Sequence, residues 1–184
     1  MKYIGKLFNK YKVNFPIEED IVIIIGMNGT GKTKTLELLR NYYLNNKDNV
    51  LYFPSDRILT ITKDDAESVE TSIETMLKLM GSQYPIYFKD YRNFKYTKKG
   101  EYINNGILQF QNFVTNIALG GKNLKVLIDM PEINLDLNKE NLFIKTLTLF
   151  SNIKQLVIVT HSPSIMSTYS DKAYDIEKIV NIFE

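Results

Sequence analysis

Four short apolar runs along the chain predict the strands of a buried sheet. They read DIVIII, NVLYF, KVLI and QLVIVT and occupy residues 20–25, 49–53, 125–128 and 155–160. Continuous apolar runs, rather than alternating ones, are typical of strands that are covered on both faces. The segment up to Phe15 alternates aromatic or aliphatic side chains with polar ones, which predicts one or two further strands at the start of the chain.

Amphipathic stretches lie between these runs and predict helices. The helical patterns cover residues 32–45, about 64–80, 110–117 (before Gly120-Gly121) and 142–150. The alternation of strands and helices predicts an α/β fold, a sandwich with a mainly parallel core sheet. Neither the N-terminal strands nor residues 174–184 are joined by a crossover helix, so we expect antiparallel strands at the N-terminal edge.

The organisation of the chain predicts one domain. No repeat, low-complexity tract or Pro/Gly/Ser-rich linker interrupts residues 1–184. Within this domain we expect a helix and a hairpin to be inserted at about residues 58–102.

The sequence GMNGTGKT, from Gly26 to Thr33, matches the phosphate-loop (P-loop) pattern G-x-x-x-x-G-K-[ST] at every fixed position. A predicted buried strand enters it and a predicted helix leaves it, as this motif requires. Its glycines let backbone N–H groups approach phosphate oxygens, and the helix N-terminus adds partial positive charge. Lys32 is predicted to reach the β- and γ-phosphates and the Thr33 hydroxyl to ligate Mg²⁺, so ATP and Mg²⁺ are the expected ligands. The candidate nucleotide contacts are Gly26, Asn28, Gly29, Thr30, Gly31, Lys32, Thr33 and Thr35.

The third apolar run ends in an acidic residue, Asp129. In P-loop folds an aspartate at such a strand end holds magnesium, so Thr33 and Asp129 are the candidate metal ligands. The next residue is Met130, and a thioether cannot accept a proton from water. Glu132 is the nearest carboxylate beyond it and is therefore the candidate general base.

Two further sites are predicted to meet the phosphates. His161 follows the fourth apolar run within VTHSP, at the carboxyl edge of the sheet where ligands bind in α/β folds. Asn104, Asn105 and Gly106 begin an amphipathic stretch, and a helix start of this kind is a ready anion site. Lys32, Asp129, Glu132 and His161 are thus the candidate catalytic residues, and Asn105 and Gly106 are further nucleotide contacts.

The order of these motifs, a phosphate loop, a glycine-containing helix start, D-x-P-E-x-x-L and T-H-S-P, resembles the ABC-type ATPase heads. The chain looks closest to the OLD-like and structural-maintenance-of-chromosomes-like branch, whose strand end commonly reads D-E-P-E-x-x-L. The likeness covers roughly residues 2–183. It implies a three-layer P-loop NTPase sandwich, with Gly26–Thr33 as the Walker A loop and Asp129 as the Walker B acid. His161 would be the switch histidine that senses the γ-phosphate.

The resemblance also implies a partner. Such heads work as dimers that sandwich two nucleotides, so an ATP-dependent homodimer is expected. Asn104–Gly106 would stand where the family has its L-S-G-G signature, which contacts ATP bound by the other subunit. Leu135 and Asp136 would lie in the dimer-contact loop after the Walker B acid. A protein partner, such as a nuclease or another DNA-acting protein, is a further expectation.

Two positions depart from the family pattern. Asparagine replaces the signature serine, although an amide N–H can still donate to a phosphate oxygen. Met130 occupies the position of the catalytic glutamate. General-base assistance is worth about 10²–10⁴-fold, so we expect slow hydrolysis with nucleotide binding retained.

Composition excludes several other classes. Of 184 residues 44% are hydrophobic, which excludes wholesale disorder, and the formal net charge of +2 gives no global attraction for nucleic acid. The absence of cysteine excludes thiolate metal sites, and a single histidine disfavours a His-built zinc site. The longest apolar run, residues 21–27, is too short to cross a bilayer, so we expect a cytoplasmic protein without membrane contact.

Several residues have alternative interpretations. Arg57 could reach a phosphate or be a surface residue at a strand exit, and Gln83 matches the family's magnesium-contacting glutamine only loosely. Residues 84–102 interleave aromatic and basic side chains, which fits either nucleic-acid contact or, in our preferred interpretation, a structural hairpin. Tyr3 or Tyr11 could stack on adenine, although core or edge packing is the simpler interpretation.

Four functions remain open at this point. The first is an ATPase head that dimerises on ATP and controls a partner, and the second is an ATP clamp or sensor without turnover. A membrane-transport ATPase would carry a fuller signature and a helical coupling region. A small-molecule kinase would require an arginine-rich lid, for which Arg92 alone in residues 84–102 is poor support.

Overall fold

The structure, a computed structural model, describes residues 1–55, 113, 116–117, 119–133, 135 and 137–182. The strands are β1 (Lys2–Leu7), β2 (Tyr11–Phe15), β3 (Ile21–Ile25), β4 (Val50–Phe53), β5 (Leu124–Asp129), β6 (Ile153–Val159), β7 (Ala173–Asp175) and β8 (Val180–Ile182). The helices are α1 (Lys32–Asn45), α4 (Leu137–Leu147), α5 (Pro163–Thr168) and α6 (Ile176–Ile179), with a 3₁₀ turn at Ser170–Lys172.

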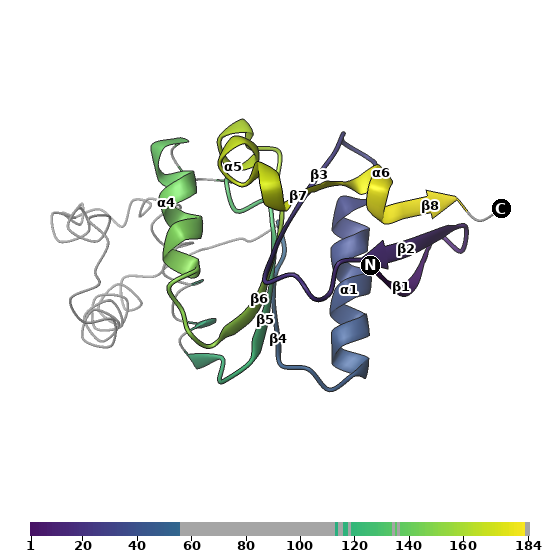
Figure 1. Ribbon diagram of the computed structural model, residues 1–184, viewed down its shortest axis with the longest axis horizontal. Helices are drawn as coiled ribbons and strands as arrows, with labels where there is room; N and C mark the ends of the chain where they lie inside the picture. Colours follow the sequence, from purple (N-terminus) through teal and green to yellow (C-terminus); the bar gives the residue numbers. More distant parts are fainter. Residues whose placement is uncertain (56–112, 114–115, 118, 134, 136, 183–184) are drawn as a thin grey trace, which may run out of the picture.

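The core of the fold is a five-stranded sheet in the order β4-β5-β6-β3-β7 (Figure 1). Every neighbouring pair in it is parallel. The four continuous apolar runs of the sequence form β3, β4, β5 and β6, so the prediction of a mainly parallel core sheet is confirmed. Because all five strands run the same way, their carboxyl ends lie along one edge.

A second, smaller sheet holds the antiparallel strands. It has the order β1-β2-β8, and both of its pairings are antiparallel. The C-terminal segment therefore divides: β7 joins the core sheet beside β3, and β8 joins the small sheet beside β2. The antiparallel strands predicted at the N-terminus are present, and they form a sheet of their own.

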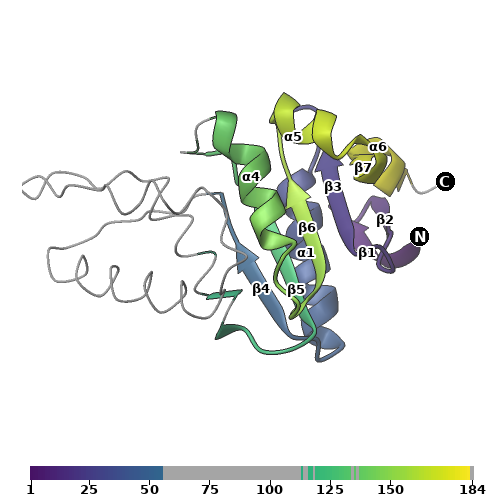
Figure 2. The ribbon, with the colours of Figure 1, turned by 60° about the vertical axis from the view of Figure 1, so that its left-hand side comes forward.

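The core sheet lies between two layers of helices, as predicted for a three-layer sandwich, and the small sheet adds a further layer (Figure 2). Helices α4 and α5 cover one face of the core sheet, where Phe143, Ile144 and Ile165 are buried against Val126 and Ile158. Helix α1 covers the other face and is itself covered by the small sheet. That side of the core consists of Ile4, Leu7, Val13, Phe15, Val22, Ile24, Leu36, Leu39, Tyr43, Leu127, Val157, Val159, Ile176 and Ile179.

The alternation of side chains along β5 places its two charged residues on the same face of the sheet. Residues two apart share a face of a strand, and Leu127 packs on the α1 side of the sheet. Lys125 and Asp129 therefore point to that side as well. Each is buried, with exposed fractions of 7% and 0%. One face of β5 thus carries a cation at its start, an apolar residue in the middle and a carboxylate at its end.

Two helices differ from the prediction. The stripe at residues 142–150 predicts a helix there, and α4 instead spans Leu137–Leu147, beginning with a polar first turn that an apolar stripe cannot reveal. Helix α5 was not predicted, although Ser162 caps it and Pro163 opens it. The predicted helix at 64–80 and the insertion at 58–102 lie outside the described residues, and the single-domain expectation stays a prediction.

Candidate nucleotide-binding site

The predicted phosphate loop connects β3 to α1 at the carboxyl edge of the core sheet. Gly26 has a φ of 143°, and a Cβ built there would lie 2.6 Å from Cγ2 of Ile176. Gly31 has a φ of 92° and forms the N-cap of α1 without a side-chain hydrogen bond. Only glycine tolerates both positions, so the helix begins with its first N–H groups directed into the loop.

Lys32 folds back over this loop. Its Nζ donates to the carbonyl oxygens of Gly26 at 3.0 Å and Met27 at 2.7 Å, and the residue is 5% exposed. Burial lowers the pKa of Lys32, while the nearby carboxylates of Asp129 and Asp175 oppose that shift. The side chain of Thr30 donates to the same Met27 carbonyl at 2.8 Å. The loop is therefore closed around a cation.

Thr33 and Asp129 meet across the site. The Thr33 hydroxyl, in the first turn of α1, donates to Oδ2 of Asp129 at 2.8 Å, although 96 positions separate the two residues. The two predicted metal ligands are thus in direct contact, at the point where α1 passes over the end of β5.

Their chemistry suits magnesium. A hydroxyl and a carboxylate are hard oxygen donors, and Mg²⁺ in phosphate-transfer sites typically takes one or two protein ligands, with phosphate and water completing its shell. No group of three His, Cys, Asp or Glu side chains in the described part of the chain could hold a metal ion by itself. The residues therefore fit a magnesium ion that arrives with a nucleotide, and do not form a closed metal cage.

The segment after β5 turns sharply back over the sheet. Met130 has a φ of 50°, and its N–H donates to the Val159 carbonyl at 2.8 Å. This turn brings Glu132 beside the end of β6, where its Oε1 accepts the backbone N–H of His161 at 2.7 Å. The structure thus joins two predicted catalytic residues that are 29 positions apart in the sequence.

Two buried polar atoms remain unmatched at this junction. Oε2 of Glu132 and Nε2 of His161 are buried and have no hydrogen-bond partner among the residues that the structure describes. An unpaired buried polar atom costs about 1–3 kcal/mol, so both atoms are poised to accept or donate to something else. Oγ1 of Thr35, a predicted nucleotide contact, is in the same situation.

Buried hydrogen bonds of Ser162 hold the backbone beside His161 in place. The Ser162 hydroxyl donates to the carboxylate of Glu140 in α4 and accepts the Ile165 N–H at 3.2 Å. The Ser162 N–H donates to the hydroxyl of Thr160 at 3.0 Å. Ser162 is only 4% exposed, so these buried hydrogen bonds hold the backbone next to His161 in place.

An aromatic residue that the sequence analysis did not select lies at the loop. Phe8, in the β1–β2 turn, is 68% exposed, and its Cε2 lies 3.8 Å from a Cβ built on Gly31. Tyr11 instead packs against the α1-side core, and Lys10 lies over its ring. No pattern in the sequence indicated Phe8, because its position depends on how the hairpin folds over α1.

Some candidates cannot be placed. Arg57, Gln83, Asn104, Asn105, Gly106, Asp136 and residues 84–102 lie outside the described residues. Leu135 is half-buried, and its N–H donates to the Glu132 carbonyl at 2.9 Å. Asn28 and Gly29 are exposed, and nothing lies within 4 Å of a Cβ built on Gly29.

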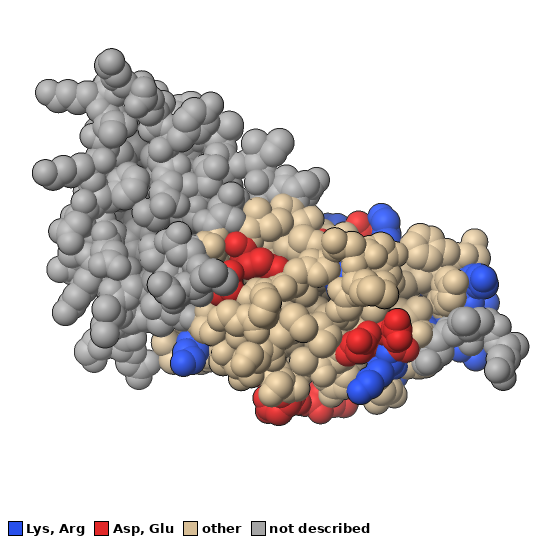
Figure 3. Space-filling view, turned by 90° about the horizontal axis from the view of Figure 1, so that it is seen from above, with Lys and Arg blue, Asp and Glu red and all other residues tan. Residues whose placement is uncertain are grey.

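The face that carries the loop is mostly uncharged in its described part. In the view onto this edge of the sheet, lysine and arginine side chains do not gather into a single patch (Figure 3). No described helix is long and apolar enough to cross a membrane.

Comparison with solved structures gives a relationship of fold. No protein-family profile matches the sequence, and no curated protein matches it. A solved structure from Pyrococcus furiosus, described as an ABC transporter ATP-binding protein, superposes with a TM-score of 0.57 and 16% identity. The match covers 87% of this chain and 86% of that one. At this identity the likeness shows the fold alone, an α/β sandwich of the P-loop NTPase type.

Proposed function

We propose that this chain is an ATP-binding, slowly hydrolysing ABC-type ATPase. The observation that carries the proposal is the 2.8 Å hydrogen bond between Thr33 and Asp129. It brings the end of the phosphate loop to the acidic strand end, as a site for a magnesium-bound triphosphate requires. Lys32 lies in the same loop and is only 5% exposed, and its ammonium would exchange a backbone carbonyl for a phosphate oxygen. Magnesium would neutralise charge on the phosphates.

In this proposal Glu132 accepts the proton of the attacking water. Met130 cannot take that role, because a thioether is no base. Glu132 has one oxygen held by the His161 amide and the other buried without a partner in the described part. The water oxygen would bond to the γ-phosphorus as the bond to the β,γ-bridging oxygen breaks, ADP would leave with that electron pair, and the water proton would pass to Oε2.

A second function, an ATP clamp without turnover, is favoured by Met130 itself. The position directly after Asp129 carries no base, and Glu132 is tied to the backbone of the neighbouring loop. The two functions share nucleotide binding and differ only in phosphate release.

Dimerisation on ATP is part of the proposal, and exposed apolar side chains support it. Met27 in the phosphate loop is 74% exposed, Phe8 is 68% exposed, and Ile133 after β5 is 37% exposed. All three stand on turns at the carboxyl edge of the sheet. Exposed apolar side chains gathered on one face mark contact sites. The order of motifs also supports a place in the OLD-like branch and a DNA-acting or nuclease partner.

Two measurements test the proposal together. Light scattering should give the monomer mass without nucleotide and twice that mass with a non-hydrolysable ATP analogue and Mg²⁺. Met27→Glu should prevent the dimer, while Leu149→Glu, at an exposed apolar residue beyond the other end of α4, should not. Phosphate release from ATP then distinguishes the hydrolysing ATPase from the ATP clamp without turnover. Protein that binds no ATP would refute both.

A further inference from the structure

A cavity of about 250 Å³ opens at the end of the core sheet opposite to the phosphate loop. Lys125 and Lys154 lie near the starts of β5 and β6, and Asp20 precedes β3. Since these strands are parallel, their starts lie at the edge away from Asp129. Sites for drug-sized ligands have about 300–1,000 Å³, so this cavity suits a smaller molecule.

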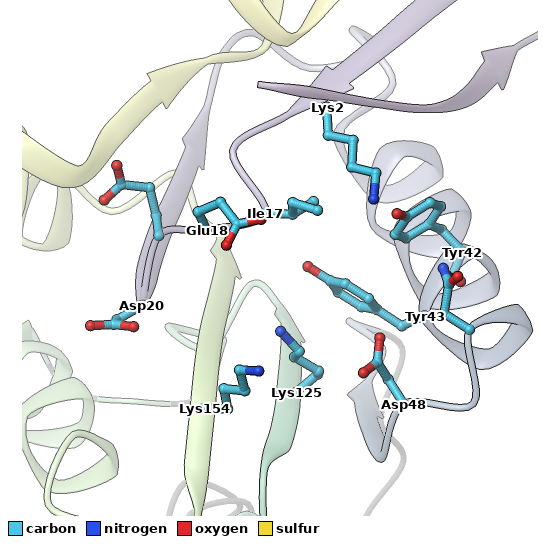
Figure 4. Close-up of a pocket in the computed structure, with 11 residues that line it drawn as sticks. Lys2, Ile17, Glu18, Asp20, Tyr42, Tyr43, Asp48, Lys125 and Lys154 are labelled. Carbon is cyan, nitrogen blue, oxygen red and sulfur yellow. Dashed lines mark hydrogen bonds between the residues drawn. The ribbon is translucent and has the colours of Figure 1, made fainter.

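Lys125 is the buried cation of this cavity. The residue is 7% exposed, and its Nζ lies 5.0 Å from the centroid of the Tyr43 ring. Its ammonium points into the cavity (Figure 4). Neither a hydrogen bond nor an ion pair to the side-chain ammonium of Lys125 is found among the described residues. The three N–H donors of this ammonium therefore face the cavity without a protein acceptor in the described part of the chain.

Charges around Lys125 act on it from a distance. Burial lowers the pKa of Lys125, whereas the carboxylates of Asp48, Glu18 and Asp20 oppose that shift and Lys154 adds to it. None of these four residues forms a direct ion pair with Lys125. The cavity thus exposes cationic and anionic groups side by side, and each is available to a ligand.

The wall behind Lys125 is held in place by hydrogen bonds. The Tyr43 hydroxyl donates to the side-chain oxygen of Gln155, whose Nε2 donates to the carbonyls of Ile17 at 3.2 Å and Glu19 at 2.6 Å. These bonds join α1, β6 and the segment before β3. Because the wall is already ordered, a ligand would lose little free energy in shaping it.

We propose that this cavity binds a small zwitterion of the α-amino acid class. Its carboxylate would lie against Lys125 and Lys154, and its ammonium against one of the two flanking carboxylates, Glu18 or Asp48. A simple anion would be repelled by the surrounding carboxylates, and a simple cation by the lysines. A zwitterion carries no net charge and satisfies both sets, so charge complementarity selects it over either. This inference is independent of nucleotide binding.

The test is a titration followed by amide resonances in ¹⁵N-labelled protein without nucleotide. The probes are L-alanine, acetate and methylammonium, each up to on the order of 10 mM, the range of weak binding. L-Alanine should shift the resonances of Tyr43 and Lys125, and each single-charge probe should bind at least about tenfold more weakly, a difference of about 1.4 kcal/mol.

Matched variants locate the effect. Lys125→Met keeps the length of the side chain over Tyr43 and should abolish the L-alanine shifts. Lys122→Met, at an exposed lysine outside the cavity, should leave them unchanged. If Lys125→Met does not fold, Lys154→Met, at an exposed position, should weaken binding at least about threefold, a difference of about 0.6 kcal/mol. Equal shifts with acetate, no shift with any probe, or full binding by Lys125→Met would each overturn the proposal.

Discussion

Replacement of Glu132 separates its structural role from its chemical one. Its Oε1 accepts the His161 N–H at 2.7 Å, and its Oε2 has no partner in the described part of the chain. Hydrogen bonds to charged groups contribute about 1.5–3 kcal/mol. Glu132→Ala leaves the His161 amide without this acceptor and should lower the free energy of unfolding by about that amount. Glu132→Gln keeps a carbonyl oxygen for the amide and should change it by less than about 1 kcal/mol.

Turnover should respond differently from stability. Neither glutamine nor alanine can take a proton from water, so both variants should release phosphate about 10²–10⁴-fold more slowly. Urea unfolding measures the change in the free energy of unfolding, and phosphate release at saturating ATP measures the change in turnover. Glu177→Gln, at an exposed glutamate in α6, is the matched control and should change neither. If Glu132→Gln hydrolyses ATP as fast as the wild type, Glu132 is not the base.

Three further predictions concern the phosphate loop, the aromatic residue beside it and a buried tyrosine. Thr33→Ala removes a proposed metal ligand and should weaken ATP binding about tenfold with Mg²⁺ but not with EDTA, as measured by calorimetry; equal losses in both buffers would contradict the assignment. Phe8→Ala should weaken ATP binding by about 1–3 kcal/mol if the ring stacks on adenine, while Phe8→Tyr should not, and unchanged affinity of the alanine variant would exclude stacking. Burial raises the pKa of Tyr43 above its ordinary value of 10.0. Above that pH the unfolded chain loses a proton that the folded chain keeps, so stability present below it should fall by up to about 1.4 kcal/mol per pH unit. Tyr43→Phe should show a shallower fall in urea unfolding, and an identical pH dependence would refute this.

The sequence was sufficient where local pattern determines structure. The backbone conformation of the phosphate loop could be predicted, because its spacing of glycines and Lys32 is typical of one conformation. That conformation occurs between a strand and a helix. The buried strands were predictable because continuous apolar runs have few other uses. Asp129 was identified by its place at the end of such a run.

The contacts of the site depended on the order of the strands, which local pattern does not encode. Strand β6 lies between β3 and β5, so the meeting of Thr33 with Asp129 requires the start of α1 to reach across β6. The bond between Glu132 and the His161 amide depends on the left-handed turn at Met130. An apolar methionine gives no sign of that turn in the sequence.

Other features had a signal that the sequence analysis did not use, or none at all. The Ser-Pro pair at Ser162 and Pro163 is a helix-start signal, and it marks α5. Phe8 had no such signal, because the hairpin is placed over Gly31 by packing with α1. The cation Lys125 stands inside an apolar run, where its burial depends on the space beside Tyr43.

The central claim is that the loop from Gly26 to Thr33 holds a triphosphate, and equilibrium dialysis against labelled ATP with Mg²⁺ tests it most directly. The wild-type chain should retain one ATP per chain, and Lys32→Met should lose at least about tenfold in affinity, or about 1.4 kcal/mol. Lys34→Met, two positions further along the same helix at an exposed lysine, should bind like the wild type. Wild-type protein that retains no ATP, or a Lys32→Met variant that binds ATP equally well, would contradict the account.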